Sequence, residues 1–386
     1  MTTPRFLQIH TLHSYTAALL NRDDSGQAKR LVYGGTSRTR ISSQCLKRHW
    51  RMAREESDGR IIRDDPHALQ HLAGYVDSKR SREVIEKRVI APLAGHYSAE
   101  VLQALTSEML NVVYGKEGSP QPLLFGEPEI EWLAAEGRSL AEQANGDPKK
   151  VKELAAAWAG KDNKNFKNNW KAFREGRQLP AGLVATLFGR MVTSDPAANI
   201  DAPIHVAHAF TVHAAESEAD YFAVVNDLQT TDDPPGADHI SETEITCGLF
   251  YGYVVIDLPG LISNLGGDSD LASRVTHNLL HLIAEVSPGA KLGSTAPYGR
   301  ADLMLVEAGD RQPRSLATSY RKAIPHDLSK AIEALDKRLK EFDAAYATGE
   351  ERRQMCVEDE IDGIEKGSLA ALAEWAAAKV KEAGNA

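Results

Sequence analysis

Residues 21–54 read NRDDSGQAKRLVYGGTSRTRISSQCLKRHWRMAR and carry nine lysines and arginines against two aspartates, a net charge of +7. The whole chain of 386 residues has a formal charge of −9. Such a local inversion of charge is typical of a polyanion-binding surface, although a solvated basic face has the same composition. Gly34 and Gly35 let a ligand approach the backbone, and the hydroxyl and amide side chains of residues 36–44 add short donors. This mixture favours phosphate recognition.

The second half of the stretch predicts a helix that begins at Ser42 or Ser43, because either side chain can cap the first turn. Leu46, Trp50 and Ala53 recur at helical spacing and should face the core. A basic row lies one residue further along and consists of Lys47, Arg51 and Arg54. Before the helix, the Gly34-Gly35 pair predicts a short hairpin. Cations in the first turn are disfavoured by the helix dipole, so a bound anion would stabilise this helix.

Outward from this stretch, alternating apolar patterns predict strands at 5–12, 203–212, 245–258 and 301–306. With helices at 43–56 and 268–286 the order becomes βαββαβ, so we predict an α+β fold with a modified ferredoxin-like or RNA-recognition-motif sheet. The segment 216–244 looks like a projecting hairpin, and helical patterns fill residues 60–200. The predicted parts are 1–59, 60–200, 201–215, 216–244, 245–310 and a helical 311–386.

Composition excludes several classes of protein. Three isolated cysteines without a CxxC pair argue against a disulfide framework or a zinc site and favour a reducing compartment. No apolar run approaches the ~18 residues of a membrane span, so we expect a cytoplasmic protein without membrane contact. His205, His208 and His213 follow a predicted strand on which His208 points away from the other two, and no carboxylate cluster accompanies them. We therefore predict structural or RNA-facing histidines, and no metal or cofactor.

A second basic region, residues 145–177, has nine cations against four acidic residues, a net charge of +5. Phe166, Trp170 and Phe173 recur there at helical spacing. Such spacing is more often a packed helix face than a base-stacking platform. The lysines of the same region suit non-specific contact with a duplex backbone.

Five strings carry a family resemblance: NRDD, GGTSRTRISSQCLKRHWR, LFGRMVTS, VAHAFTVHAAESEADYFAVVNDLQ and EVSPGAKLGSTAPYG. With them the chain closely resembles the CasC family, the repeated backbone subunit of the type I-E CRISPR surveillance complex, Cascade. The resemblance spans the whole chain and is weakest in the helical insertion and the C-terminal helices. It implies a right-hand shape, with a palm, helical fingers and a thumb hairpin.

The resemblance also implies a function. Copies of the chain would stack into a helical filament along the CRISPR RNA, with each thumb folding over RNA held by a neighbour and flipping out bases at intervals. The remaining guide bases would pair with target DNA, forming an R-loop in antiviral defence. Implied partners are CRISPR RNA, target DNA through the guide, further copies of the chain, the large, small, cap and RNA-processing subunits, and a recruited nuclease–helicase.

The implied site residues fall into two sets. The predicted RNA contacts are Arg22, Lys29, Arg38, Arg40, Ser42, Ser43, Gln44, Lys47 and Arg51, with Met191 as a base wedge, Tyr221 and Phe222 on the thumb, and Lys291 in the loop 287–299. The predicted DNA contacts are Lys149, Lys150 and Lys152. Arg22, Arg51 and Lys152 come from the charge pattern, and the others match family positions.

Two alternatives stay open at this stage. The first is an RNA-cleaving backbone subunit, because Asp23 and Asp24 lie in a loop comparable to one that carries an acidic residue in related type III complexes. We favour a structural role for both aspartates, since no acid–base pair with an orienting group accompanies them, and we predict no enzymatic activity. The second is a stand-alone RNA-binding protein, which would gain little from ordering an unanchored arm.

Overall fold

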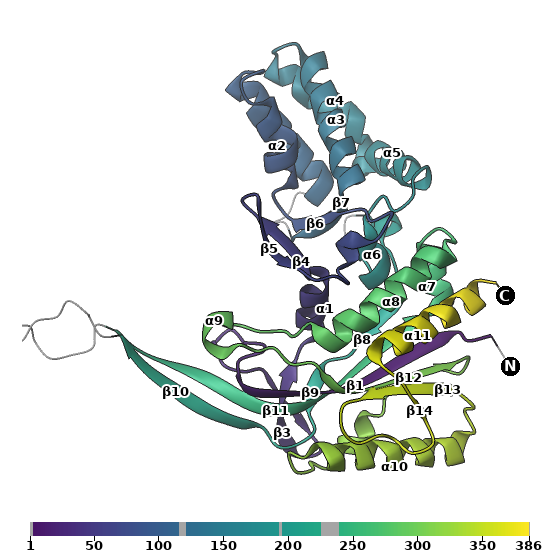
Figure 1. The fold of residues 1–386 in the computed structure, drawn as a ribbon. Helices are drawn as coiled ribbons and strands as arrows, with labels where there is room; N and C mark the ends of the chain where they lie inside the picture. Colours follow the sequence, from purple (N-terminus) through teal and green to yellow (C-terminus); the bar gives the residue numbers. More distant parts are fainter. Residues whose placement is uncertain (1–2, 116–120, 193–194, 225–238, 386) are drawn as a thin grey trace, which may run out of the picture. The chain divides into compact units, whose positions relative to one another are not determined.

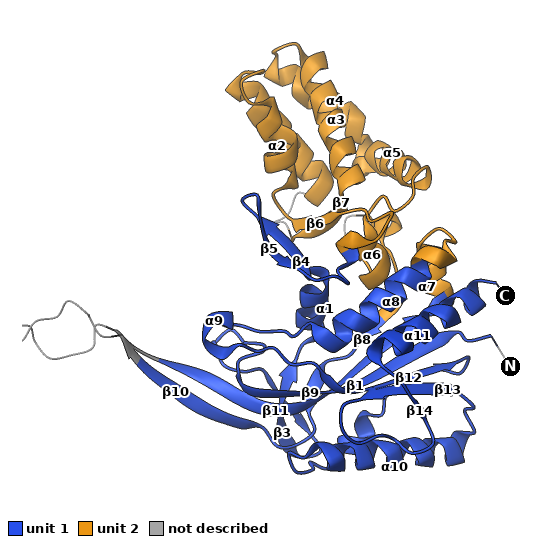
Figure 2. Cartoon of the chain, viewed as in Figure 1, with its two compact units in different colours: residues 1–69, 205–258, 272–386 blue, residues 70–204, 259–271 orange. Residues whose placement is uncertain are grey.

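The computed structural model describes residues 3–115, 121–192, 195–224 and 239–385. The chain forms two compact units (Figure 2). Unit 1 contains residues 1–69, 205–258 and 272–386, and unit 2 contains residues 70–204 and 259–271. In the described ranges no helix combines the length and apolar character needed to cross a membrane.

Unit 1 is built on one large, mostly antiparallel sheet, which confirms the predicted mixture of helices and strands. The strand order is β14-β13-β12-β1-β11-β9-β3-β2 (Figure 1). The bounds are Phe6–Ala18 for β1, Arg30–Tyr33 for β2, Thr36–Ile41 for β3, Ala209–Thr211 for β9, His239–Asp257 for β11, Ala301–Gly309 for β12, Glu351–Cys356 for β13 and Glu365–Lys366 for β14. Two further strands, β8 (Ile204–Val206) and β10 (Glu216–Val224), pair with β11 outside this order.

Helices cover both faces of this sheet (Figure 1). Helix α10 (Leu328–Tyr346) packs on one face, where Leu335 joins Leu12 of β1 and Leu305 of β12 in a single buried cluster. Helices α8 (Ser269–Glu285) and α11 (Leu369–Gly384) lie over the other face. Because both faces are covered, β1 is buried almost continuously over its first seven residues.

A buried polar network links four neighbouring strands of the sheet. Glu307 of β12 is fully buried and accepts hydrogen bonds from both terminal nitrogens of Arg314 at 2.6 and 2.8 Å. It also accepts bonds from Nε of Arg352 at 2.7 Å and from Nε2 of His10 at 3.0 Å. The other ring nitrogen of His10 accepts from the Tyr251 hydroxyl at 2.8 Å. Burial acts to raise the pKa of Glu307, but the bonds and charges of Arg314 and His10 outweigh it and hold the pKa well below its usual range.

Three sequence predictions need correction. The helix predicted at 43–56 ends early: α1 spans Ser43–Arg51, and a β4–β5 hairpin (Arg54–Ser57 and Arg60–Asp64) follows. Asp58 and Gly59 both have positive φ there, as a two-residue hairpin turn requires. The strand predicted at 203–212 is interrupted between β8 and β9. The C-terminal part contains β13 and β14 beside its helices, and the high charge of the β13 sequence hides its strand character.

Unit 2 is mainly helical. Its helices are α2 (Ala99–Tyr114), α3 (Glu127–Ala144), α4 (Pro148–Ala159), α5 (Lys164–Glu175) and α6 (Leu183–Phe188), with most of α7 (Leu258–Asn264). Phe166 and Trp170 are 2% and 1% exposed, so the packed-face interpretation of their spacing is confirmed. The helical pattern predicted for residues 60–200 is interrupted by β6 (Ser78–Ser81), which pairs with β7 (Leu123–Gly126) and precedes a π-helical turn at Ile85–Ile90.

Candidate nucleic-acid interface

The basic stretch forms the predicted hairpin, with β2 and β3 joined by a two-glycine turn. Gly34 and Gly35 have φ of 61° and 78°, which is the left-handed region that a two-residue hairpin turn needs. A side chain at position 34 has no room, since an added Cβ would collide with the backbone carbonyl oxygen of Arg321. The turn is therefore pressed against the chain that follows β12.

Two buried serines begin helix α1. The Ser42 hydroxyl accepts a hydrogen bond from the amide of Cys45 at 3.3 Å, which confirms the predicted cap. The Ser42 amide donates to Oδ1 of Asn21 at 2.9 Å, and this bond joins the NRDD loop to the helix start. The Ser43 hydroxyl donates to Oε1 of Gln44 at 3.3 Å. Of the three predicted RNA contacts Ser42, Ser43 and Gln44, only Gln44 is exposed. The hydroxyls of the two serines form hydrogen bonds within the first turn of the helix.

An open pocket of about 480 Å³ brings three distant stretches of unit 1 together. It is lined by the loop around Arg22 and Asp24, by Cys45 and His49 of α1, and by residues 289–290. The amide of Gly289 donates to Nε2 of His49 at 3.4 Å, while Nδ1 of His49 donates to the Cys45 carbonyl at 2.8 Å. Burial lowers the pKa of His49, which is consistent with this neutral ring. Arg22, a predicted contact, is exposed at this pocket.

A group of cations surrounds His208 beside this pocket. Nη1 of Arg40 lies 3.1 Å from Nδ1 of His208. The pKa of His208 is lowered by burial and then by the positive charges of Arg40, Lys29 and Lys47. Within the described residues, neither Lys29 nor Arg40 forms an ion pair with a carboxylate. We call Lys29, Arg40 and Lys47 the cation cluster, and its excess positive charge is what a polyanion site requires.

Arg38, a predicted RNA contact, is enclosed by the protein. Its side chain is fully buried. Nη1 donates to the carbonyls of Thr211 at 3.0 Å and His213 at 3.2 Å, and Nη2 donates to the carbonyl of Tyr320 at 3.0 Å. Arg38 thus joins β3 to the chain after β9 and to the turn at Tyr320. These bonds favour a structural role for Arg38, and the predicted phosphate contact stays a prediction.

The hairpin of β10 and β11, which we call the arm, is joined to the basic hairpin. Its strands pair from Glu216 opposite Cys247 to Val224 opposite His239. Arg30 forms an ion pair with Glu244 of the arm, and the amide of Ala28 donates to the same carboxylate at 2.6 Å. The arm therefore begins beside the cation cluster. Residues 225–238 of the hairpin predicted at 216–244 lie outside the described residues.

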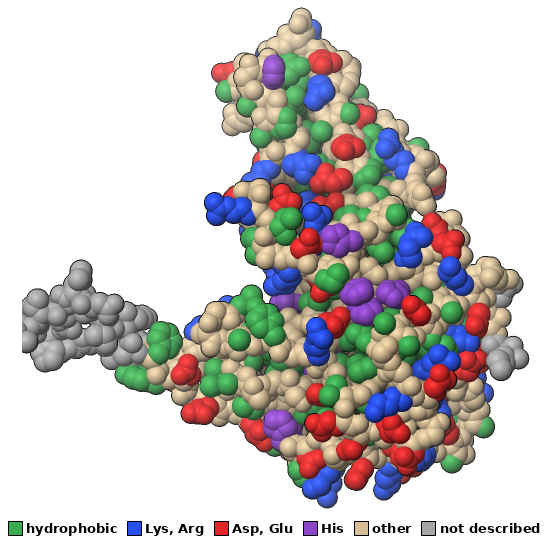
Figure 3. Space-filling view, in the orientation of Figure 1, with side chains coloured by type: hydrophobic (Ala, Val, Ile, Leu, Met, Phe, Trp, Pro, Cys, Tyr) green, Lys and Arg blue, Asp and Glu red, His purple; other side chains and the backbone are tan. Residues whose placement is uncertain are grey.

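Exposed aromatic side chains lie on the arm. Tyr221 and Phe222 are 66% and 38% exposed. Lys291, next to the short helix α9 (Leu292–Thr295), donates to the hydroxyl of Thr243, and its ammonium lies 5.3 Å from the ring centroid of Phe222. Figure 3 shows hydrophobic side chains along the arm and over α9. A cation and aromatic surfaces thus lie side by side, as in sites that bind single-stranded nucleic acid.

Of the remaining predicted contacts, all but Arg51 lie in unit 2. Met191 is 74% exposed and follows Arg190, whose buried Nη1 donates to Glu129 at 2.6 Å. The exposed lysines of α4 are Lys149, Lys150 and Lys152. Arg51 of α1, in unit 1, is partly exposed. Each of these side chains reaches solvent.

Sequence patterns missed Glu244 and His49, although both shape this surface, and they did not pair His208 with Arg40. Glu244 lies 216 residues from its partner Ala28, and His208 lies 168 residues from Arg40. A local sequence pattern cannot predict hydrogen bonds between residues that are so far apart in the chain. The only sequence signal is the presence of polar residues inside strings that are otherwise basic or apolar.

Comparison with solved structures identifies the class of fold. A chain of a CRISPR RNA-guided surveillance complex in a pre-nicking state shares 24% identity and a TM-score of 0.76, with 97% of this chain and 100% of that chain covered. A second chain, also of a CRISPR RNA-guided surveillance complex, shares 21% identity and a TM-score of 0.59, with 97% and 98% covered. These likenesses establish a shared fold.

The family follows from the sequence itself. The family model for CT1975-like protein, a Cas family, matches residues 7–382, so the chain belongs to that family. Among curated proteins, the comparison finds no match.

Proposed function

We propose that this chain is the RNA-binding backbone subunit of a type I-E CRISPR surveillance complex, similar to CasC, and that it polymerises along the guide. The observation that carries the proposal is the surface of unit 1, where the cation cluster adjoins the pocket of about 480 Å³ formed by the NRDD loop, α1 and residues 289–290. Membership of a Cas family and the fold shared with surveillance-complex chains support it.

The arrangement of strands supports the palm assignment. The four predicted strands correspond to β1, β9, β11 and β12, and they lie in the order β12-β1-β11-β9. Helix α1 follows β1 in the chain, and α8 lies between β11 and β12. This order supports the proposed βαββαβ plan of an RNA-recognition-motif sheet. We assign unit 2 as the fingers and the arm as the thumb.

Phosphate binding by the cation cluster is the proposed chemistry. Lys29, Arg40 and Lys47 neutralise phosphates, and the exposed Gln44 adds a polar contact at the start of α1. Such contacts carry no sequence information, as a carrier of many different guides requires. Specificity for target DNA then comes from base pairing with the guide.

The arm supplies the proposed contact with a neighbouring copy. Stacking of a base on Tyr221 or Phe222 would stabilise binding by ~1–3 kcal/mol. Met191 is exposed as a wedge requires, and unstacking a base step costs roughly a few kcal/mol. The lysines of α4 are proposed to touch the target duplex. The other subunits and the recruited nuclease–helicase belong to this proposal through the family resemblance.

A non-catalytic role is part of the proposal. Oδ1 of Asp23 accepts hydrogen bonds from the amides of Ser25 at 3.0 Å and Gln27 at 2.9 Å, which favours a loop-shaping function. Burial raises the pKa of the Cys45 thiol to about 11, so this cysteine beside His49 is protonated at neutral pH and a poor nucleophile. Incubating the assembled complex with matched RNA and magnesium tests this assignment. Cleavage that is lost in Asp23→Ala would contradict it.

Assembly on RNA tests the main proposal. We expect the purified chain to bind a CRISPR RNA as multimers whose mass, measured by light scattering, rises with guide length. We expect Lys29→Ala to lower affinity equally for different spacer sequences and to reduce the salt slope by about 0.7. Lys330→Ala, an exposed lysine on α10, is the matched control and should leave both unchanged. A monomer on a long guide would refute the proposal.

A further inference from the structure

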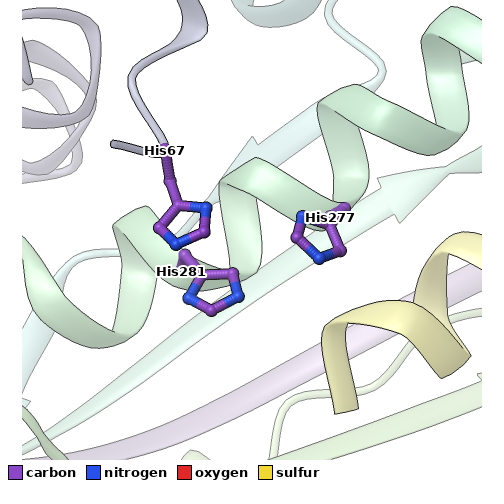
Figure 4. Close-up of side chains that lie close together, drawn as sticks. All are labelled: His67, His277 and His281. Carbon is purple, nitrogen blue, oxygen red and sulfur yellow. The ribbon is translucent and has the colours of Figure 1, made fainter. Parts of the chain in front are cut away.

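Three histidines of unit 1 lie together away from the proposed RNA surface. His277 and His281 are one turn apart on α8, and His67 comes from the segment after β5 (Figure 4). One ring nitrogen from each lies within 4.8 Å of the other two. The rings of His67 and His281 are stacked, with centroids 3.6 Å apart. Histidine side chains reach the surface over α8 (Figure 3).

The hydrogen bonds of His281 match those of a metal ligand. Nδ1 of His281 lies 3.2 Å from Oε2 of Glu285, so it donates its proton to that carboxylate. Nε2 then carries the free lone pair, and this atom is buried without a hydrogen-bond partner. His281 as a whole is only 8% exposed. A carboxylate that orients an imidazole in this way is the usual outer shell of a metal-bound histidine.

The other two histidines are also able to present a lone pair. Nδ1 of His277 lies 3.2 Å from Oδ1 of Asn278, which leaves Nε2 for a ligand. The backbone amide of His67 donates to Oδ1 of Asp65 at 2.8 Å, and this bond fixes the turn that carries the ring.

A second histidine group lacks these properties. His213, Glu216 and His326 also lie within 4.8 Å of one another. However, Nδ1 of His213 donates to the Ala214 carbonyl at 2.7 Å, and Nε2 accepts from the amide of Leu249 at 3.1 Å. Both nitrogens are used, so His213 has no lone pair to offer. This contrast makes the group on α8 the stronger metal site among the described residues.

We propose that His67, His277 and His281 bind a divalent transition-metal ion, with Zn²⁺ as the fitting choice and Glu285 as the outer-shell partner. Imidazole nitrogens suit zinc, copper and nickel rather than magnesium or calcium. A tetrahedral zinc ion places its nitrogen ligands about 3.4 Å apart, given Zn–N bonds of about 2.1 Å. To bind the ion, the ring of His67 must tilt out of its stack on His281. A water molecule would complete the coordination.

The ion would act as a structural clip. It would join the turn at Asp65–Ala68 to the middle of α8, two parts of unit 1 that lie more than 200 residues apart in the sequence. The Asp65 amide already donates to the carbonyl of Ala53, just after α1, at 3.0 Å. The clip would therefore hold the end of the α1–β5 region against α8, independently of RNA.

Zinc titration of the full-length, chelator-treated protein tests the site. We expect one tightly bound ion per chain, measured by competition with a chromophoric chelator and confirmed by elemental mass spectrometry. Cobalt in place of zinc should give the intense visible absorption of a tetrahedral site. Failure of the wild-type chain to bind zinc more tightly than His277→Gln would overturn the proposal.

Variants separate this site from other histidines. His67→Gln and His277→Gln should each abolish the tight site, and Glu285→Gln should weaken it about 10- to 100-fold by removing the outer-shell bond. His326→Ala is the matched control and should retain full binding. Circular dichroism checks that each variant is folded. An ion retained by His67→Gln with unchanged affinity would show that zinc binds elsewhere.

Discussion

Replacing Arg38 with alanine distinguishes a structural arginine from an RNA contact. The substitution removes three hydrogen bonds from a fully buried guanidinium to the carbonyls of Thr211, His213 and Tyr320. Each carbonyl left unpaired costs ~1–3 kcal/mol. Part of this loss is offset, because Arg38 forms no ion pair with a carboxylate in the described ranges and its burial carries a desolvation cost.

We therefore expect Arg38→Ala to lower the free energy of unfolding of unit 1 by about 3 kcal/mol. For a unit of this size, such a loss lowers the melting temperature by roughly 6–12 °C. Denaturant unfolding followed by circular dichroism measures the first quantity and calorimetry the second. The matched control is Arg40→Ala, two residues further along β3, which should weaken RNA binding and change the melting temperature by less than roughly 2 °C.

Measurement of RNA binding tests the alternative role of Arg38 as an RNA contact. If Arg38 is structural, the folded Arg38→Ala protein should keep the salt slope of wild-type RNA binding, while Arg40→Ala loses about 0.7 of that slope. An unchanged stability together with a reduced slope for Arg38→Ala would refute the structural assignment. It would also support the phosphate contact that the family resemblance implies.

Two further predictions concern stability. Gly34→Ala should lower the melting temperature because the new Cβ meets the Arg321 carbonyl and the turn needs positive φ, whereas Gly35→Ala, which meets no atom within 4 Å, should cost less. Acid should destabilise unit 1, because the pKa values of Glu307 and His10 are both lowered in the fold. The stability that each group contributes is fully present above its ordinary pKa, which is 4.5 for Glu307 and 6.5 for His10. That stability is lost as the pH falls below this value. The loss is at most ~1.4 kcal/mol per pH unit for each group, and His10→Gln should flatten the slope just below pH 6.5 in equilibrium unfolding.

The sequence predicts those parts of the fold that local periodicity and turn chemistry decide. Helix α8 (Ser269–Glu285) closely matches its predicted bounds of 268–286, since it has an apolar stripe and a clear break at its ends. The hairpin at Gly34-Gly35 follows from the backbone freedom of glycine. The β4–β5 hairpin has a comparable Asp58-Gly59 signal, but the helical spacing of Leu46, Trp50 and Ala53 extends the predicted helix to residue 56.

The rest depends on pairings that no local pattern contains. Strand β13 carries charged residues whose partners, Glu307 and Asp343, are supplied by other elements, so its sequence resembles a solvated segment. Arg38 and Arg40 are indistinguishable by composition, yet one is enclosed and the other lies in the cation cluster. The spacing of His277 and His281 by one helical turn is visible in the sequence. The third histidine of the group, His67, lies in a turn that is far away in the chain.

Lys291 joins the two halves of the proposed RNA surface. Its ammonium lies over Phe222 of the arm, and its backbone belongs to the loop that contributes Gly289 to the pocket. An exposed cation–π contact stabilises by only about 0.5–1 kcal/mol, and a phosphate offers a charge-assisted bond that is stronger. Under the proposed function, RNA in the pocket would draw Lys291 from the ring and free Phe222 to stack. Binding of the RNA backbone and the position of the arm would then be coupled through the side chain of Lys291.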